Sequence, residues 1–109
     1  MNAALTLHRA TTFIQRLWGL HAYPPLCGDT GLYLAPCRAV HTLGLRDAID
    51  VVFLDRGGRV VRQVAALSPG RFAWCRSAFA VVELPGGYCR ARPNYALAIR
   101  AALDRNGAD

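Results

Sequence analysis

The sequence contains no lysine: all thirteen basic residues are arginine, and the formal net charge is +6. It also has no apolar run near the roughly 18 residues that a membrane-spanning helix needs. Its first residues, MNAALTLHRATTF, lack the early positive region and the long apolar stretch of a signal peptide. We therefore expect a protein without a membrane span, located in the cytoplasm.

The sequence has no C-x-x-C pair and no glycine-rich phosphate loop. Its four cysteines, separated by 10, 38 and 14 residues, fit no common zinc module. We therefore predict no metal site and no cofactor. We expect the cysteines to be reduced and to pack as small apolar side chains; a single disulfide or a redox role is the alternative. The residues concerned are Cys27, Cys37, Cys75 and Cys89.

The length of 109 residues suits one domain with a single hydrophobic core. Apolar residues make up 53% of the chain and charged residues only 18%, which is typical of a folded globular protein. Six prolines and ten glycines are scattered along it, and they indicate many short elements joined by turns.

The clearest strand lies over residues 48–55, AIDVVFLD, which are apolar on both faces and should therefore be internal. The DRGG sequence at 55–58 predicts a turn, and the β-formers of 59–67 return from it, so we expect a hairpin over 49–66. Shorter strands are predicted in several other segments, at 4–10, 30–36, 39–43, 72–74 and 79–85.

Two segments have helical patterns. Residues 12–19 begin with Thr12 and Gln15, which are spaced as in a capping box. Residues 94–106 begin at Asn94, a good N-cap, and carry an apolar stripe at helical spacing. The stripe consists of Tyr95, Ile99 and Leu103. The chain therefore reads as six to eight short strands with two helices.

Five landmarks follow one another along the chain: RLWGL at 16–20, GLYLAPC at 31–37, VHTLGLRDAIDVVFLD at 40–55, GRVVRQV at 58–64 and AVVELPGG at 80–87. On these motifs the chain resembles the prokaryotic domain of unknown function 192 family over roughly residues 5–90. The resemblance implies a mainly β fold, as a small antiparallel jelly-roll-like sandwich or a distorted barrel with short helices. It implies no biochemical activity.

The block from 41 to 50 places a histidine, an arginine and an aspartate beside the internal strand. His41 should point opposite to its neighbours Val40 and Thr42, toward a surface or a cleft. Its imidazole either stabilises the turn or contacts a ligand. Together with Thr42 and Arg46, it would line a polar cleft.

Two carboxylates lie within apolar strands, where an unpaired charge is costly. Asp50 needs a partner, and Arg46 or Arg16 could provide it as an ion pair. Alternatively, Asp50 caps a turn or orients His41 in the cleft. Glu83 either bonds backbone amides or an arginine, or lines the same polar pocket.

We expect an accessory or ligand-binding domain whose cleft holds a small anionic or polyhydroxyl ligand, because arginine and histidine bind anions well. The cleft would consist of His41, Thr42, Arg46 and Asp50, with Arg16 and Glu83 as second-tier members. The alternatives are a protein-interaction module that docks by a sheet edge or the terminal helix, and a hydrolytic enzyme using His41 with Asp50. The arginines are too dispersed to favour a nucleic-acid partner.

Overall fold

The computed structural model describes residues 4–10 and 28–105, and within them the chain forms a mainly β fold. The helix predicted at 12–19 and the candidate Arg16 lie outside the described residues. The described elements, in chain order, are β1 (Thr6–Ala10), β2 (Thr30–Leu34), β3 (Ala39–His41), β4 (Ile49–Leu54), β5 (Val60–Leu67), β6 (Phe72–Trp74), β7 (Ala80–Pro85), α2 (Tyr88–Ala91) and α3 (Tyr95–Arg105).

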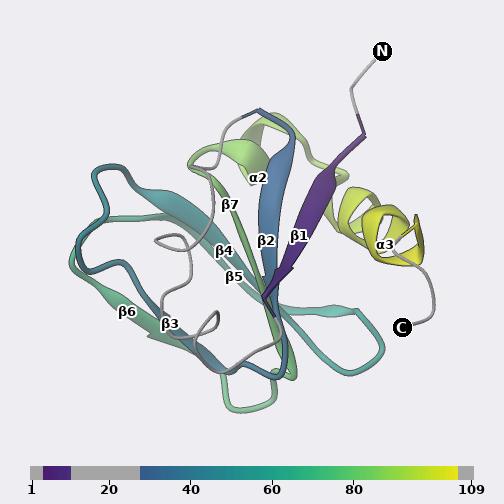
Figure 1. Cartoon of the computed structure of the whole chain (residues 1–109), viewed down its shortest axis with the longest axis horizontal. Helices are drawn as coiled ribbons and strands as arrows, with labels where there is room; N and C mark the ends of the chain where they lie inside the picture. Colours follow the sequence, from purple (N-terminus) through teal and green to yellow (C-terminus); the bar gives the residue numbers. More distant parts are fainter. Residues whose placement is uncertain (1–3, 11–27, 106–109) are drawn as a thin grey trace.

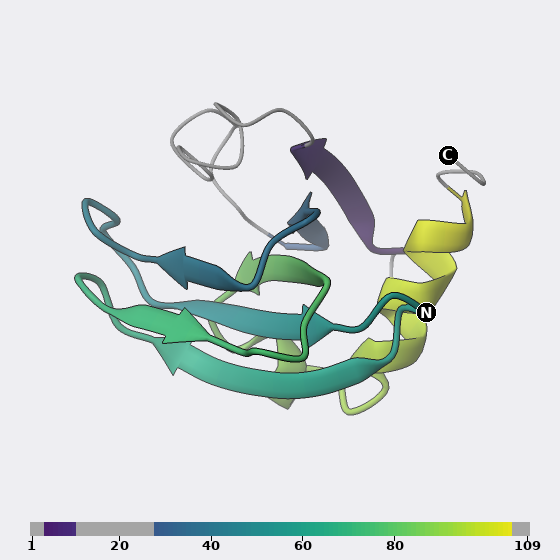
Figure 2. The ribbon, with the colours of Figure 1, turned by 90° about the horizontal axis from the view of Figure 1, so that it is seen from below.

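The strands form two sheets (Figure 1): a five-stranded sheet in the order β1-β2-β7-β4-β5 and a two-stranded ribbon of β3 and β6. Seen from below, the ribbon lies beside β4 and β5, at the end of the molecule remote from α3 (Figure 2). The predicted mainly β fold is confirmed, and the five-stranded sheet is open rather than closed into a barrel. One pair departs from the antiparallel expectation, because β1 runs parallel to β2.

The two faces of the five-stranded sheet bury different sets of side chains. One face and the helices form the helix-side cluster: Leu5, Leu7, Val52, Leu54, Ala80, Val82, Leu84, Tyr88, Cys89, Ile99 and Ala102. The other face and the ribbon form the ribbon-side cluster: Leu32, Leu34, Val40, Ile49, Val51, Phe53, Ala73, Ala78 and Val81. All six residues of β4 are buried, which confirms that this strand is internal.

The predicted hairpin is confirmed as the antiparallel pair of β4 and β5. Its turn is closed by Asp55, whose Oδ1 accepts the backbone N–H groups of Gly57 and Arg59, both at 2.9 Å. Gly58 adopts a φ of +81°, a conformation that L side chains rarely tolerate. The aspartate and the glycine together explain why DRGG makes a tight turn here.

The predicted terminal helix is confirmed as α3, with Ile99 fully buried and Tyr95 and Leu103 packed at the edge of the helix-side cluster. The short helix α2 was not predicted, because Pro85, Gly86 and Gly87 indicate only a turn. None of the helices in the described parts of the chain is long and apolar enough to cross a membrane.

Candidate functional site

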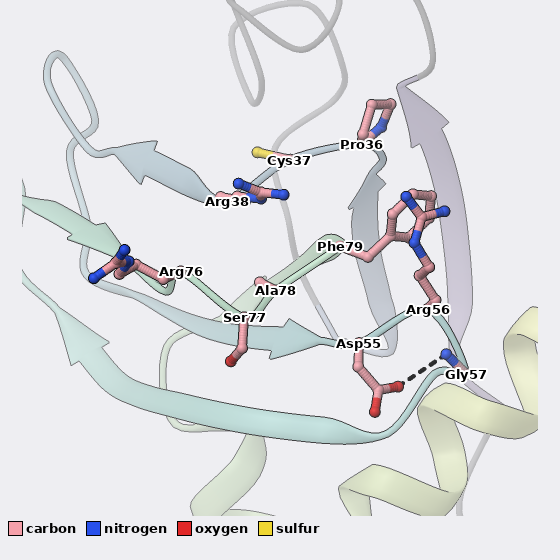
Figure 3. A pocket seen from close by; sticks show the side chains of 10 residues that line it. All are labelled: Pro36, Cys37, Arg38, Asp55, Arg56, Gly57, Arg76, Ser77, Ala78 and Phe79. Carbon is pink, nitrogen blue, oxygen red and sulfur yellow. Dashed lines mark hydrogen bonds between the residues drawn. The ribbon is translucent and has the colours of Figure 1, made fainter.

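A concave pocket of about 820 Å³ opens where three connecting segments meet (Figure 3). We call it the arginine pocket. The segments precede β3, follow β4 and precede β7, so their residues are far apart in the sequence. The lining residues are Pro36, Cys37, Arg38, Asp55, Arg56, Gly57, Arg76, Ser77, Ala78 and Phe79.

Backbone hydrogen bonds tie the three segments into one frame. The Cys37 N–H donates to the Phe79 carbonyl at 2.8 Å, and the Cys75 N–H donates to the Arg38 carbonyl at 2.9 Å. The Phe79 N–H in turn donates to the carbonyl of Leu54, at the end of β4, at 2.7 Å. Because these three hydrogen bonds join the segments to one another, the side chains that line the pocket are held on a well-defined backbone.

Three guanidinium groups line the pocket, from Arg38, Arg56 and Arg76. All three residues are exposed, so a ligand can reach them from water. The Cζ of Arg56 lies 4.6 Å from the centroid of the Phe79 ring, in a cation–π contact that orients this guanidinium. Planar guanidinium groups bind phosphate and carboxylate oxygens in pairs, which suits them to anion recognition.

Among the residues that the structure describes, one carboxylate lines the arginine pocket, that of Asp55. One of its oxygens already accepts two backbone N–H groups of the hairpin turn. Within the described ranges, the pocket is therefore lined by three positive charges and one negative charge, and Oδ1 of the negative group is bonded to the backbone. A concave surface with this surplus attracts small anions.

These three arginines were not among the residues singled out from the sequence. They are separated by many residues, and none belongs to a recognisable motif. The sequence signal that does exist is local: Arg56 occupies the predicted hairpin turn, and the other two lie next to short predicted strands. Only the pairing of the segments brings them together.

His41 ends β3 and is half-buried beside the exposed aromatic side chain of Phe72. The two ring centroids are 6.2 Å apart and the planes are tilted by 56°. The Nδ1 of His41 accepts the backbone N–H of Leu43 at 3.2 Å, so the imidazole supports the turn that follows β3. Both sequence neighbours of His41, Val40 and Thr42, are buried, as expected if the imidazole points to the opposite side of the strand.

Thr42 is completely buried and joins two loops. Its hydroxyl donates to the carbonyl of Ser68 at 2.6 Å and accepts the backbone N–H of Arg71 at 2.8 Å. The backbone N–H of Thr42 also donates to the Arg71 carbonyl at 2.9 Å. These bonds fasten the end of β3 to the connection between β5 and β6. Arg46, in the loop that follows, is exposed.

Asp50 is completely buried, and its carboxylate accepts three backbone N–H groups. Oδ1 accepts from Ala66 at 2.9 Å and from Gly87 at 3.1 Å, and Oδ2 accepts from Cys89 at 2.9 Å. Backbone amides, rather than the guanidinium of Arg46, are thus the partners that a buried charge requires. The carboxylate connects β4 to β5 and to the start of α2.

The bond to Ala66 explains a distortion of β5. The register between β4 and β5 shifts between Ile49 and Val51, so two residues of β5 face Asp50. Ala66 has a φ of +53° there, in the left-handed region. The Asp50 carboxylate holds the amide of this bulge, which is how a strained backbone position is commonly stabilised.

Glu83 lies in the centre of the sheet, where β7 pairs with both neighbouring strands. The residues that pair with Glu83 on the two neighbouring strands are Leu32 and Val51, which are both apolar. Only 3% of Glu83 is exposed, and its Oε1 has no hydrogen-bond partner in the part of the chain that the structure describes. Burial of the carboxyl raises its pKa to about 7.

The described residues do not bring the predicted cleft together as one open site. Asp50 pairs with Leu84 of the helix-side cluster, and Glu83 pairs with Val51 of the ribbon-side cluster, so the two carboxyls point to opposite faces of the sheet. His41 bonds the following turn instead of either carboxyl. The ligand-binding role of these candidates stays a prediction.

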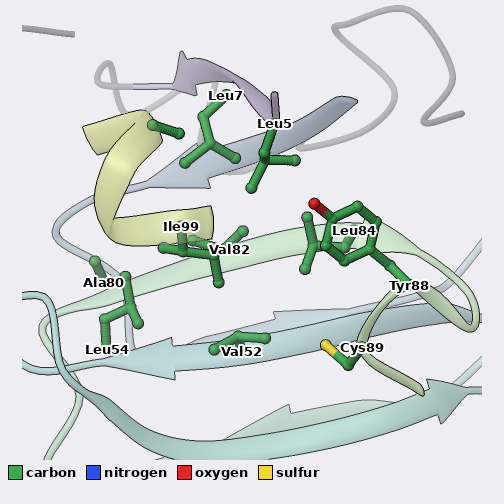
Figure 4. Close-up of a cluster of buried hydrophobic side chains, with 11 residues drawn as sticks. Leu5, Leu7, Val52, Leu54, Ala80, Val82, Leu84, Tyr88, Cys89 and Ile99 are labelled. Carbon is green, nitrogen blue, oxygen red and sulfur yellow. The ribbon is translucent and has the colours of Figure 1, made fainter. Parts of the chain in front are cut away.

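The cysteines of residues 28–105 carry thiols rather than disulfides: Cys37, Cys75 and Cys89. Cys89 lies among the apolar side chains of the helix-side cluster (Figure 4). Burial there, and the nearby charge of Asp50, raise the pKa of its thiol to about 12. No group of three or more histidine, cysteine, aspartate or glutamate residues in the described ranges is arranged to hold a metal ion.

The chain belongs to the family DUF192, described as "Uncharacterized ACR", whose model matches residues 1–93. Two solved structures have a similar fold. One is a protein of unknown function from Novosphingobium aromaticivorans, with a TM-score of 0.70, 19% identity, and coverage of 80% of this chain and 67% of the other. The second, from Sinorhizobium meliloti, is described as a "putative transcription regulator" and has a TM-score of 0.71, 19% identity and coverage of 80% and 73%. No curated protein matches the chain.

Proposed function

We propose that this member of the DUF192 family is a ligand-binding domain that holds a small anion in the arginine pocket. The observation that carries the proposal is that Arg38, Arg56 and Arg76 all line one concave surface. This proposal keeps the ligand class expected from the sequence, a small anion, and assigns it to a different set of arginines.

Two features support an anion over an uncharged ligand. Three guanidinium groups face one carboxylate among the described lining residues, and Oδ1 of that carboxylate, from Asp55, is already engaged by the hairpin turn. The contact between Arg56 and Phe79 orients one guanidinium before any ligand arrives, which lowers the entropy that binding costs. A phosphate or carboxylate group bound there would receive paired N–H donors.

Isothermal titration with inorganic phosphate tests the proposal. We expect binding that weakens with added sodium chloride, because exposed charges are screened over about 10 Å at 0.1 M salt. Arg56→Ala should weaken phosphate binding by about tenfold, a loss of about 1.4 kcal/mol.

Arg46→Ala is the matched control, because it removes the same charge from an exposed residue outside the arginine pocket. Equal losses in the two variants would indicate general attraction by the net charge and would contradict a specific pocket. His41→Ala tests the cleft expected from the sequence in the same assay. A loss in His41→Ala together with unchanged binding in Arg56→Ala would move the site back to that cleft.

A second candidate function is protein docking through the edge of the ribbon. Phe72 and Trp74 of β6 are 63% and 62% exposed, although both are large apolar side chains. Aromatic residues are enriched at protein interfaces relative to the rest of the surface. Changing both residues to serine should abolish capture of a purified partner while phosphate binding is retained. Retained capture would rule out this edge.

A further inference from the structure

A second, smaller pocket lies next to the arginine pocket and shares a wall with it. It has a volume of about 190 Å³ and is formed by the ends of β1 and β2, the hairpin turn and α3. Its lining residues are Arg9, Tyr33, Arg56, Gly57, Gly58, Arg100, Leu103 and Asp104. Arg56 and Gly57 line both pockets, so the two hollows adjoin at the turn between β4 and β5.

The charge of the second pocket resembles that of the first. Three guanidinium groups line it, from Arg9, Arg56 and Arg100, against one carboxylate, that of Asp104. Taken together, and counting Arg56 once, the two pockets present five arginines and two aspartates. Five of the thirteen arginines in the chain therefore line two pockets that adjoin at Arg56 and Gly57.

Contacts hold the arginines of the second pocket in place. The guanidinium of Arg9 lies 5.0 Å from the centroid of the Tyr33 ring. The Nη2 of Arg100 donates to the carbonyl of Gly57 at 3.0 Å, which anchors α3 to the hairpin turn. Each pocket thus has a guanidinium stacked on an aromatic ring, and Arg56 stands between the two hollows.

We infer that the two pockets form one two-lobed site for a ligand that carries several anionic groups along a short chain, as linear polyphosphates do. The inference rests on the proposed function, because it needs the arginine pocket to bind an anion. A ligand that engages both lobes gains from effective concentration, since the second anionic group binds intramolecularly. A single anion such as phosphate occupies only one lobe at a time.

The test compares inorganic phosphate with tripolyphosphate in calorimetric titrations of the whole chain at matched ionic strength. We expect tripolyphosphate to bind at least about tenfold more tightly than phosphate, because linked groups add their binding. Arg9→Ala and Arg100→Ala should each weaken tripolyphosphate binding several-fold and leave phosphate binding to the first lobe nearly unchanged. Arg76→Ala should weaken both anions, and Arg46→Ala neither.

The outcomes separate this inference from the proposed function. If Arg76→Ala weakens both anions but Arg9→Ala and Arg100→Ala leave tripolyphosphate binding unchanged, the arginine pocket binds anions and the two-lobed site is wrong. If neither anion binds the wild-type chain, both proposals fail. Two variants of the second lobe are used, with circular dichroism of each, so that a local structural change in one does not decide the result.

A short single-stranded oligonucleotide tests whether the site binds nucleic acid instead, because nucleic acid is also a linear polyanion. We expect it to bind more weakly than tripolyphosphate at the same salt concentration. Tighter binding of the oligonucleotide, with the same dependence on Arg9 and Arg100, would overturn the small-ligand inference in favour of a nucleic-acid surface.

Discussion

Replacing Glu83 by glutamine should remove a pH dependence from the stability of the fold. The carboxyl is buried and its pKa is raised from 4.5 to about 7. Below pH 4.5 the group is protonated in both the folded and the unfolded chain, so it contributes no difference. Between pH 4.5 and 7 the unfolded chain releases the proton and the folded chain keeps it, so the free energy of unfolding falls as the pH rises.

The size of the effect follows from that shift. The pKa values of the folded and unfolded chain differ by about 2.5, which corresponds to about 3.5 kcal/mol at about 1.4 kcal/mol for a pKa difference of one. The decline should level off above pH 7, where the carboxyl is ionised in both states. Glutamine has nearly the same shape and does not titrate, so the stability of Glu83→Gln should lack this decline.

Urea unfolding followed by circular dichroism, at several pH values from 4.5 to 8.5, measures the difference between the two proteins. All other titrating groups are common to both and cancel in the difference. We expect the stability of Glu83→Gln to rise by about 3.5 kcal/mol relative to the wild type across this pH range. A second neutral variant, Glu83→Met, should show the same pH profile. A difference that does not change with pH would refute the idea that burial keeps this carboxyl protonated.

Three further predictions concern the backbone that surrounds the sites. Asp50→Asn should lower the free energy of unfolding by about 3 kcal/mol in urea at pH 7, because an amide cannot accept all three buried N–H groups; an unchanged midpoint would contradict the role of this carboxylate. Ala66→Gly should raise the free energy of unfolding by about 0.5 to 1 kcal/mol, since glycine tolerates a φ of +53°. The control Ala65→Gly should lower the free energy of unfolding. Gly31→Ala should lower the melting temperature, because the added Cβ would lie 2.7 Å from Leu84 Cδ2 and 2.9 Å from the Glu83 carbonyl oxygen. A melting temperature equal to that of the wild type would show that the strands can move apart there.

Most of the fold could be predicted from local pattern. The double-sided apolar run of β4, the DRGG turn and the return of β5 are all features of neighbouring residues, and all three are confirmed. The helix α2 could not be predicted, because two glycines precede it and it has only four residues. The parallel pairing of β1 with β2 was also missed, because strand direction depends on how distant segments are connected.

The site was harder to predict because its residues share no local pattern. The sequence drew attention to Asp50 and Glu83 since charge inside an apolar strand is unusual, and both are indeed buried. The nature of their surroundings depends on distant parts of the chain. The amides that bond Asp50 come from β5, the turn after β7 and α2, and no spacing in the sequence relates them.

The register of the sheet explains why these two carboxyls cannot share a cleft. Asp50 pairs with Leu84 and Val51 pairs with Glu83, and successive side chains on a strand point to opposite faces. Asp50 therefore faces the helices, and Glu83 faces the ribbon. A one-residue slip would exchange the side chains that β4 presents to the two clusters, so the packing of both clusters enforces the separation. Among the described residues, most of the charged groups that line a hollow are arginines near strand ends, which is why the proposed anion-binding role is assigned to them rather than to the buried carboxyls.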